Sequence, residues 1–356
     1  MRILHLANHC HRAGNGIVNV AVDLACSQAL ENHEIAFASA PGGYLAILAQ
    51  HGVRYFEVDQ TRRAPLPLAT ASIALFSVLR AFQPEIVHAH MMTGAVLGRL
   101  FSPCFKYRIV TTVHNEFQRS AILMGVGDLV IAISAASARA MARRGIPKRR
   151  IRIVHNGVLG SPRLERRAGE NVALSRPAIV TVAGLNWRKG IADLIEAFDI
   201  ISRYSRDSHL YIVGDGPQRK EFEVQATRCF DRSRIHFIGF TPDPRPYYQA
   251  ADIFVLASHK EPFGLVITEA REAGCAVVAT DVGGIPEALD GGDAGVLVPP
   301  HRSDILAKAI ITLIDSPFHR ERLQRRARQN LEDFSVKRCN AQTMDVYREL
   351  LDSSPM

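Results

Sequence analysis

The sequence predicts an α/β protein of two domains, each a parallel sheet flanked by helices. Short apolar strands alternate with amphipathic helices from Arg2 to Arg144, and the alternation restarts at Ala178. Between the two series lies a polar stretch without periodicity, residues 160–176, which is typical of a domain boundary. A chain of 356 residues also exceeds what one hydrophobic core usually supports. We therefore expect domains at 1–160 and 178–335, joined by a linker at 161–177.

Composition and leader signals indicate a reduced, intracellular protein. Its six cysteines form no C-x-x-C pair, which argues against a zinc site or a disulfide framework. The start M-R-I-L-H-L-A-N-H-C reaches histidine too soon for a signal-peptide core. No stretch approaches the ~18 apolar residues of a membrane span. We expect a cytoplasmic location.

The positive charge is concentrated in the first half of the chain. The net charge is +8, but residues 1–170 hold 20 Lys+Arg against 10 Asp+Glu, which leaves 23 against 25 for residues 171–356. A basic half suits nucleic acid, an anionic membrane surface or an acidic substrate. Because aromatic residues are not interleaved with these arginines, we expect no nucleic-acid partner.

The first domain begins with a βα unit. The strand Arg2–Ala7 is followed by a polar loop with Gly14 and Gly16 and by a helix through Leu30. This loop lacks the third glycine of the dinucleotide fingerprint, so an NAD enzyme is not expected. Further strands are predicted at Glu34–Ser39, Tyr55–Val58, Ile86–His90, Ile109–His114, Val130–Ser134 and Ile151–Gly157, with helices at Tyr44–Gly52, Leu68–Phe82 and Ala135–Arg144.

Histidines stand at the ends of two predicted strands. Polar residues at the carboxyl ends of parallel strands face the edge where α/β proteins bind ligands, which makes His88, His90 and His114 candidates. The alternative for each is a hydrogen-bonded histidine that caps its strand, and for His88 this alternative is favoured.

The second domain opens with the strand Ala178–Ala183 and the loop G-L-N-W-R-K-G before the helix Ile191–Arg203. Arg188 and Lys189 precede that helix. Cations at a helix start oppose its dipole, so an anionic ligand would explain them, and a solvated helix start is the alternative. Strands follow at His209–Val213, which ends at Gly214, and at Ile235–Gly239, Asp252–Leu256 and Cys275–Ala279, with later helices at Ser303–Asp315, His319–Asp333 and Val336–Leu351.

A strand–loop–helix unit around residues 258–287 carries the strongest functional signal. Glu261-Pro262-Phe263-Gly264 leads into the helix Leu265–Ala273. The backbone N–H groups of Phe263, Gly264, Leu265 and Val266 suit a phosphate. Glu261 and Glu269 are placed to accept hydrogen bonds from sugar hydroxyls. The alternative is that Glu261 is an ordinary charge at a helix start and Glu269 an ordinary solvated side chain. A second glycine-rich loop, Gly283-Gly284, favours a binding site.

This stretch resembles the donor-binding motif of glycosyltransferase family 4, whose members are retaining enzymes with the GT-B fold. The matching residues are Glu261, Pro262, Phe263, Gly264, Leu265, Glu269, Gly283, Gly284, Pro286 and Glu287. The resemblance implies two Rossmann-like domains facing a central cleft, with a C-terminal helix at 336–356 that crosses back to the first domain. It also implies a nucleotide-diphosphate sugar as donor and no cofactor.

The resemblance also assigns roles. His114, in T-T-V-H, would reach the donor sugar and act in catalysis with Glu261, and Lys189 would contact the donor pyrophosphate. Glu269 would hold the ribose. Gly184 stands where the family has an arginine, so Arg188 becomes its replacement, and Leu159 stands where the family has an aspartate. We further assign Gly16 and Gly214 to the donor site, and Gly14 and His90 to the acceptor side.

No D-x-D pair occurs, so we expect no metal and assign the leaving diphosphate to Lys189 and the helix N–H groups. The expected activity is sugar transfer, with retention, to a glycan or lipid-linked acceptor, in the synthesis of surface polysaccharide, lipopolysaccharide or glycolipid. A nucleotide-sugar epimerase of the same fold and a non-catalytic binding protein are the alternatives. A run of basic residues predicts contact with an anionic membrane surface, and a solvated basic face is the alternative. The residues of this run are Arg139, Arg143, Arg144, Lys148, Arg149, Arg150 and Arg152.

Overall fold

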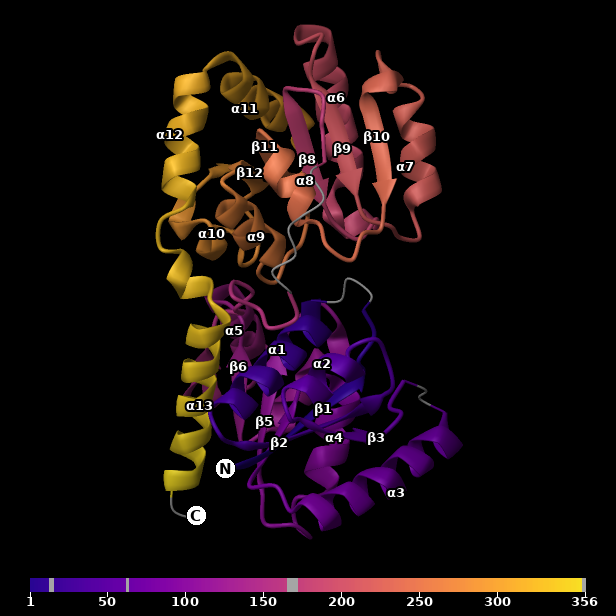
Figure 1. The fold of residues 1–356 in the computed structure, drawn as a ribbon, viewed down its shortest axis with the longest axis vertical. Coiled ribbons are helices and arrows are strands. Elements are labelled where there is room, and N and C mark those ends of the chain that lie inside the picture. The colour runs from indigo at the N-terminus through magenta and orange to yellow at the C-terminus, as the bar shows by residue number, and fades with distance from the viewer. Residues whose placement is uncertain (13–15, 62–63, 165–171, 354–356) are drawn as a thin grey trace. The chain divides into compact units, whose positions relative to one another are not determined.

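The computed structural model describes residues 1–12, 16–61, 64–164 and 172–353. The chain divides into two compact units: Met1–Glu165 with Glu332–Met356, and Arg166–Leu331. Each unit contains one parallel sheet with helices on both faces (Figure 1). The first division lies near the expected boundary at 160 because Arg163 and Ser161 bind the buried carboxylate of Asp23 at 2.8 and 2.7 Å. Of the expected linker, residues 165–171 lie outside the described residues.

The first unit has a seven-stranded sheet in the order β3-β2-β1-β4-β5-β6-β7. Its strands are β1 (Arg2–His9), β2 (Glu34–Ala40), β3 (Arg54–Glu57), β4 (Ile86–Ala89), β5 (Arg108–Val113), β6 (Leu129–Ala132) and β7 (Ile151–Ile153). Its helices in chain order are α1 (Gly16–Leu30), α2 (Leu45–Gln50), α3 (Pro65–Phe82), α4 (Met92–Phe101), η1 (Arg119–Val126), α5 (Ala135–Arg143) and η2 (Lys148–Arg150). The strand order reverses between β1 and β4, and ligands bind α/β sheets at the carboxyl ends beside such a reversal.

The second unit repeats this plan with six strands in the order β10-β9-β8-β11-β12-β13. The strands are β8 (Ala178–Val182), β9 (His209–Val213), β10 (Ile235–Gly239), β11 (Ile253–Leu256), β12 (Ala276–Thr280) and β13 (Val296–Val298). The helices are η3 (Trp187–Lys189), α6 (Ile191–Tyr204), α7 (Arg219–Ala226), η4 (Arg232–Arg234), α8 (Arg245–Ala250), α9 (Leu265–Ala273), α10 (Ile285–Ala288), η5 (Asp290–Gly292), α11 (Ser303–Asp315) and α12 (Pro317–Ala327). Here the reversal falls between β8 and β11.

The last helix, α13 (Val336–Asp352), follows η6 (Leu331–Phe334) and packs against α1 of the first unit. Its polar contacts are specific. Tyr347 lies 2.5 Å from Nδ1 of His88 through its hydroxyl, and Asn340 donates to the carboxylate of Glu31 at 2.7 Å. The C-terminal segment is therefore part of the first unit, although the chain passes through the second unit to reach it.

Helix α3 is long and apolar enough to cross a membrane by length and composition, the one such helix in the described part of the chain. The expectation that no stretch approaches this length is therefore wrong. Only 28% of the helix is buried inside the protein. Leu66 and Ile73 are 79% and 70% exposed, whereas Phe76 packs edge-on against the ring of Phe101. The helix thus presents an apolar face to the outside of the first unit.

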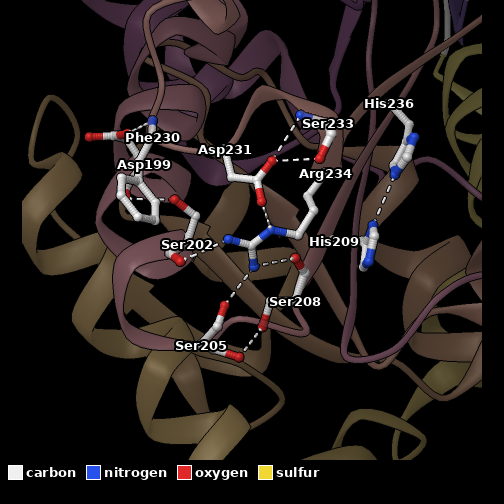
Figure 2. Close-up of polar contacts among 10 residues, drawn as sticks. All are labelled: Asp199, Ser202, Ser205, Ser208, His209, Phe230, Asp231, Ser233, Arg234 and His236. Carbon is white, nitrogen blue, oxygen red and sulfur yellow. Dashed lines mark hydrogen bonds and ion pairs between the residues drawn. The ribbon is translucent and has the colours of Figure 1, made fainter.

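A buried arginine closes the amino-terminal end of the second sheet (Figure 2). Arg234 is 6% exposed and donates to the backbone oxygens of Ser202 and Ser205, which end α6, both at 2.8 Å. Asp231 balances its charge at 2.9 Å. These bonds satisfy carbonyl groups that a helix end leaves without partners. Arg234 thereby stabilises the amino-terminal edge of the second sheet, opposite the carboxyl edge at which α/β sheets bind ligands.

Candidate functional site

The structure brings two of the predicted residues into direct contact in the second unit. Lys189, after β8, places its Nζ atom 2.5 Å from Oε2 of Glu261, which follows β11. The two side chains are only 16% and 9% exposed. Ser258 donates to the same carboxylate oxygen at 3.4 Å. A charge pair so shielded from water interacts more strongly than a surface pair, and removal of one member leaves the other charge uncompensated.

Backbone contacts hold the two loops that carry this pair. The N–H of His259 donates to the carbonyl oxygen of Arg188 at 2.8 Å, and the N–H of Gly284 donates to that of Glu261 at 3.1 Å. Gly283 has φ 58°, and a Cβ atom there would stand 1.8 Å from the Glu261 carbonyl oxygen. Only glycine fits at this position. The second glycine-rich loop therefore supports the backbone of Glu261.

Helix α9 starts at the predicted place. Gly264 is its N-cap with a left-handed backbone, φ 95°, and no side chain in the described part of the protein caps the first turn. The N–H groups at Leu265 and Val266 thus remain suited to an anion, as the sequence analysis predicts. Phe263 is only 1% exposed. Its side chain anchors the loop in the core, so a donor contact there would involve its backbone.

Glu269 lies one turn into α9 and accepts a hydrogen bond from the hydroxyl of Tyr248 at 2.8 Å. Tyr248 is 1% exposed, and burial together with the nearby Glu269 carboxylate raises its pKa well above the usual value. The tyrosine therefore stays a hydrogen-bond donor that orients Glu269. The sequence analysis missed Tyr248, because it lies on the short helix α8, which precedes β11 and the motif in the chain.

The remaining predicted donor residues lie in loops, in the turn η3 or at the start of α1. Gly214, after β9, donates its N–H to the Gly239 carbonyl oxygen at 2.8 Å. Arg188 is half-buried in the turn directly before Lys189, and Gly184 is exposed at the end of β8. Gly16 is the first residue of α1. Gly14, expected on the acceptor side, lies outside the described residues.

A series of histidines runs from the middle of β1 to the carboxyl ends of β4 and β5 in the first unit. His114 Nε2 is 3.3 Å from Nδ1 of His90, and His90 Nε2 is 3.0 Å from Nδ1 of His5. His5 Nε2 is 2.8 Å from Oε1 of Gln28 on α1. His90 is 2% exposed and both its ring nitrogens contact other histidines. This differs from the expectation that His90 faces the acceptor, because His5 and His114 occupy both of its ring nitrogens.

All rings in this series are neutral. Burial lowers the pKa of His5 to about 4 and that of His114 to about 3, and lowers that of His90 well below its usual value. A neutral imidazole has one N–H. With the oxygen of Gln28 accepting from His5, each ring accepts from the next, and His114 donates to His90. His114 Nδ1 is then an acceptor, and it has no partner among the described residues.

Two comparisons decide the family. Residues 14–158 match the family described as Glycosyltransferase Family 4, and residues 163–330 match Glycosyl transferases group 1. The chain is a family 4 glycosyltransferase. Together the two matches span both units, so the family and the transferase class expected from the sequence are confirmed.

Relatives of this glycosyltransferase cover most of the chain. A glycogen synthase of Mycobacterium tuberculosis is 28% identical over 291 residues, 75% of this chain and 69% of its own. The N-acetyl-alpha-D-glucosaminyl L-malate synthase of Bacillus anthracis is 24% identical over 370 residues, 96% of each chain. The crystal structure of HepE from Anabaena with UDP-glucose superposes with a TM-score of 0.80 at 25% identity, over 99% of this chain and 100% of that one. The GT-B fold is thereby confirmed.

Among the residues that the structure describes, the glycosyltransferase contains two groups of side chains that could hold a metal ion, which the sequence analysis did not find. The first is His5, His88 and His90, fully buried. His88 contacts Tyr347 at 2.5 Å and Thr112 at 2.6 Å through its two ring nitrogens, and the other two rings belong to the series above. Hydrogen bonds therefore account for this group. The second group is Asp193, His259 and His301 of the second unit.

Helix α9 of the glycosyltransferase is fixed by Arg271, which is fully buried. Its guanidinium donates to the carbonyl oxygens of Ala327, Ala288 and Gln329 at 2.9, 2.5 and 2.7 Å, and to the Asp290 carboxylate at 2.8 Å. These partners come from the ends of α10 and α12 and from the residues that follow them. Arg271 therefore ties the helix that carries Glu269 to its neighbouring segments.

Arg271→Lys is expected to destabilise the second unit by about 1–3 kcal/mol, because a lysine cannot reach all of these buried acceptors. In a unit of this size the melting temperature should fall by about 2–10 °C. Calorimetry of the full chain measures it. Arg322→Lys on the exposed side of α12 is the matched control. A melting temperature equal to that of the control variant would contradict the anchoring role.

Proposed function

We propose that this enzyme transfers a glycosyl group, with retention of anomeric configuration, from a nucleotide-diphosphate sugar to a hydroxyl group. The observation that carries the proposal is the shielded contact between Lys189 and Glu261 beside the start of α9. It places one cation and uncapped helix N–H groups where a leaving diphosphate needs them. The similarity to HepE, solved with UDP-glucose, favours a UDP-sugar as donor.

Each side chain has a role in this proposal. Lys189 and the N–H groups of α9 stabilise the charge that develops on the diphosphate as the glycosidic bond breaks. Arg188 provides a second positive charge, in place of the arginine that the family has at the position of Gly184. Glu269, oriented by Tyr248, accepts hydrogen bonds from the ribose hydroxyls, and Glu261 accepts from the sugar.

His114 provides an acceptor atom for the proposed donor sugar. Its Nδ1 is the partnerless end of the histidine series, so it suits a sugar hydroxyl that donates. With a pKa lowered to about 3, the ring stays neutral at physiological pH and does not serve as a proton donor. The acceptor hydroxyl would attack on the face that the diphosphate leaves, and a leaving-group oxygen would take its proton.

The acceptor is proposed to be a glycan or a lipid-linked glycan of the cell surface. The relatives named above differ in what their names imply is glycosylated, a polysaccharide in one and malate in another. The acceptor class therefore depends on this chain's own first unit, whose basic character suits an anionic acceptor.

Release of free nucleotide from UDP-glucose and related donors, with and without candidate acceptors, tests the proposed function. A transferase releases nucleotide in quantity only when the acceptor is present, whereas an epimerase converts the donor without release and a binding protein does neither. NMR of the product anomer tests retention. Glu269→Ala should raise KM for the donor more than it lowers kcat. Inversion at the anomeric carbon, or nucleotide release independent of the acceptor, would overturn the proposal.

Turnover is expected to need no divalent ion, since Lys189 and the α9 N–H groups meet the charge of the diphosphate. Assays in excess EDTA should give the same kcat at saturating donor as assays with added magnesium or manganese. A kcat that falls in EDTA and returns with either metal would show that an ion takes part in the reaction.

A peripheral contact with an anionic membrane is also proposed, on a smaller basic surface than the sequence indicates. Arg144, Arg150 and Arg152 bind protein groups, the last pairing with Glu349. The exposed members of the run are Arg139, Arg143, Lys148 and Arg149. Each basic side chain near anionic lipid contributes about 1 kcal/mol, which suffices for a weak, salt-sensitive association.

Flotation with anionic vesicles measures this contact. Binding should be present at low salt and lost by ~0.5 M salt, where screening acts over a few ångströms. Serine at the four exposed basic positions should abolish it, whereas Ile73→Ser tests the apolar face of α3. Binding that survives high salt and fails only in Ile73→Ser would assign the contact to α3. No flotation at low salt would remove the membrane proposal.

A further inference from the structure

One carboxylate and two imidazoles converge in the second unit from three different segments. Asp193 lies in the first turn of α6, His259 in the loop after β11, and His301 after β13. Oδ2 of Asp193 is 2.9 Å from Nε2 of His259 and 3.9 Å from Nδ1 of His301. One potential ligand atom from each residue lies within 4.8 Å of the others.

A hydrogen bond explains the position of His259 but not that of His301. At 3.9 Å, His301 Nδ1 is beyond hydrogen-bond distance from the carboxylate. Its backbone nevertheless has φ 58°, a conformation that residues other than glycine seldom adopt. The centroid of its ring lies 3.8 Å from that of the His259 ring. Ser303 donates to the carboxylate of Glu196 at 3.0 Å, which ties this segment to the same helix.

We propose that Asp193, His259 and His301 bind a divalent transition-metal ion. Bonds of about 2.0–2.2 Å from zinc to imidazole nitrogen and carboxylate oxygen place ligand atoms about 3–3.5 Å apart, which lies between the two separations observed. Coordination through His259 Nε2 replaces its hydrogen bond with Asp193, because a ring nitrogen binds a metal only through its lone pair, and the N–H of the neutral ring then lies on Nδ1. Imidazole with carboxylate favours zinc, cobalt or nickel over magnesium or calcium.

The ion would connect the two segments that carry the Lys189–Glu261 contact. Asp193 follows Lys189 at the start of α6, and His259 precedes Glu261 in the same loop. Neither Lys189 nor Glu261 is a ligand. The inference therefore does not depend on the proposed reaction, and metal removal should change the stability of the second unit rather than kcat.

Calorimetric titration of the chelator-treated full chain with zinc chloride tests the site. We expect saturable binding of one ion at the cluster, a visible absorption spectrum when cobalt replaces zinc, and a melting temperature raised by about 5–10 °C at zinc 100-fold above Kd. His301→Gly removes the imidazole and suits the positive φ, so this variant should fold. Its zinc affinity should be at least about ten-fold weaker.

Two controls separate this cluster from other ligands of the chain. His209 and His236 form another imidazole pair of the same unit, 3.0 Å apart, and His209→Ala should leave zinc affinity unchanged. Cys104 is an exposed thiol, and Cys104→Ser should also have no effect. Affinity that is unchanged in His301→Gly, lost in Cys104→Ser, or absent from the starting protein would overturn the proposal.

Discussion

Replacing Lys189 with alanine is expected to lower kcat/KM by about 10²–10³-fold, the effect of removing one preorganised contact to developing charge. The reason is twofold. The leaving diphosphate loses its cation. The carboxylate of Glu261 also loses its counter-charge, because it is only 9% exposed and lies 2.5 Å from Nζ of Lys189 in the unchanged protein. Steady-state kinetics with a UDP-sugar and a competent acceptor measure the loss.

A double-mutant cycle with Glu261→Gln shows whether the pair acts as a unit. Because the two side chains touch, the effects of the single substitutions should not add, and the double variant should be about as active as the weaker single variant. Glu261→Gln alone should lower kcat more than it raises KM, if its contact with the sugar strengthens in the transition state. Fully additive losses would mean that the two groups act separately.

Arg188→Ala is the matched control, since Arg188 is the adjacent cation of the same turn. A smaller loss in this variant than in Lys189→Ala would assign the diphosphate to Lys189. Near-normal turnover in Lys189→Ala, combined with a large loss in Arg188→Ala, would reverse the assignment. Arg188 would then have the role of the arginine that the family has at the position of Gly184.

The architecture could be predicted because apolar periodicity is a local signal. The strand predicted at Glu34–Ser39 and the helices predicted at Ile191–Arg203 and Leu265–Ala273 agree with the observed elements to within a residue. Helices α4, α7, α8 and α10 were missed. Helix α7 is largely polar, so it lacks the amphipathic pattern of its neighbours, whereas α8 and α10 are too short to establish one.

The candidate site was predictable residue by residue but not in its contacts. Lys189 and Glu261 were both identified, yet their direct pairing depends on the neighbouring positions of β8 and β11, which sequence spacing does not reveal. The histidine series shows the same limit. His5 stands opposite His88 in the register of β1 and β4, and Tyr347 arrives from the far end of the chain. For His5, the only signal in the sequence was a histidine within the predicted strand β1.

The buried histidines predict that the first unit unfolds at mildly acidic pH. Burial lowers the pKa of His5 to about 4 and of His114 to about 3, and that of His88 and His90 well below the ordinary value of 6.5. In the unfolded chain these groups regain ordinary pKa values, so below pH 6.5 the unfolded state binds more protons. Their contribution to stability is therefore complete above pH 6.5 and is lost as the pH falls from 6.5 toward 4.

The size of this loss should be comparable with the stability of an ordinary domain. Each depressed group costs about 1.4 kcal/mol per pH unit within that window, so four groups approach roughly 5 kcal/mol per unit. Against a typical stability of about 5–15 kcal/mol, unfolding of the first unit is expected near pH 5. The described histidines of the second unit with lowered pKa, His209 and His236, are half-buried, so that unit should persist to lower pH.

Hydrogen exchange across a pH series, read together with fluorescence, separates the two units. The single tryptophan, Trp187, lies in the second unit and reports on it alone. Near pH 5, strands β1, β4 and β5 should lose protection while the tryptophan signal is unchanged. His88→Gln removes one titrating group outside the proposed catalytic residues, so it should reduce the slope of stability against pH by about 1.4 kcal/mol per unit, whereas His209→Gln should not affect the first unit. Protection of β1 and β4 that persists to pH 4 would mean that these histidines take up protons within the folded protein.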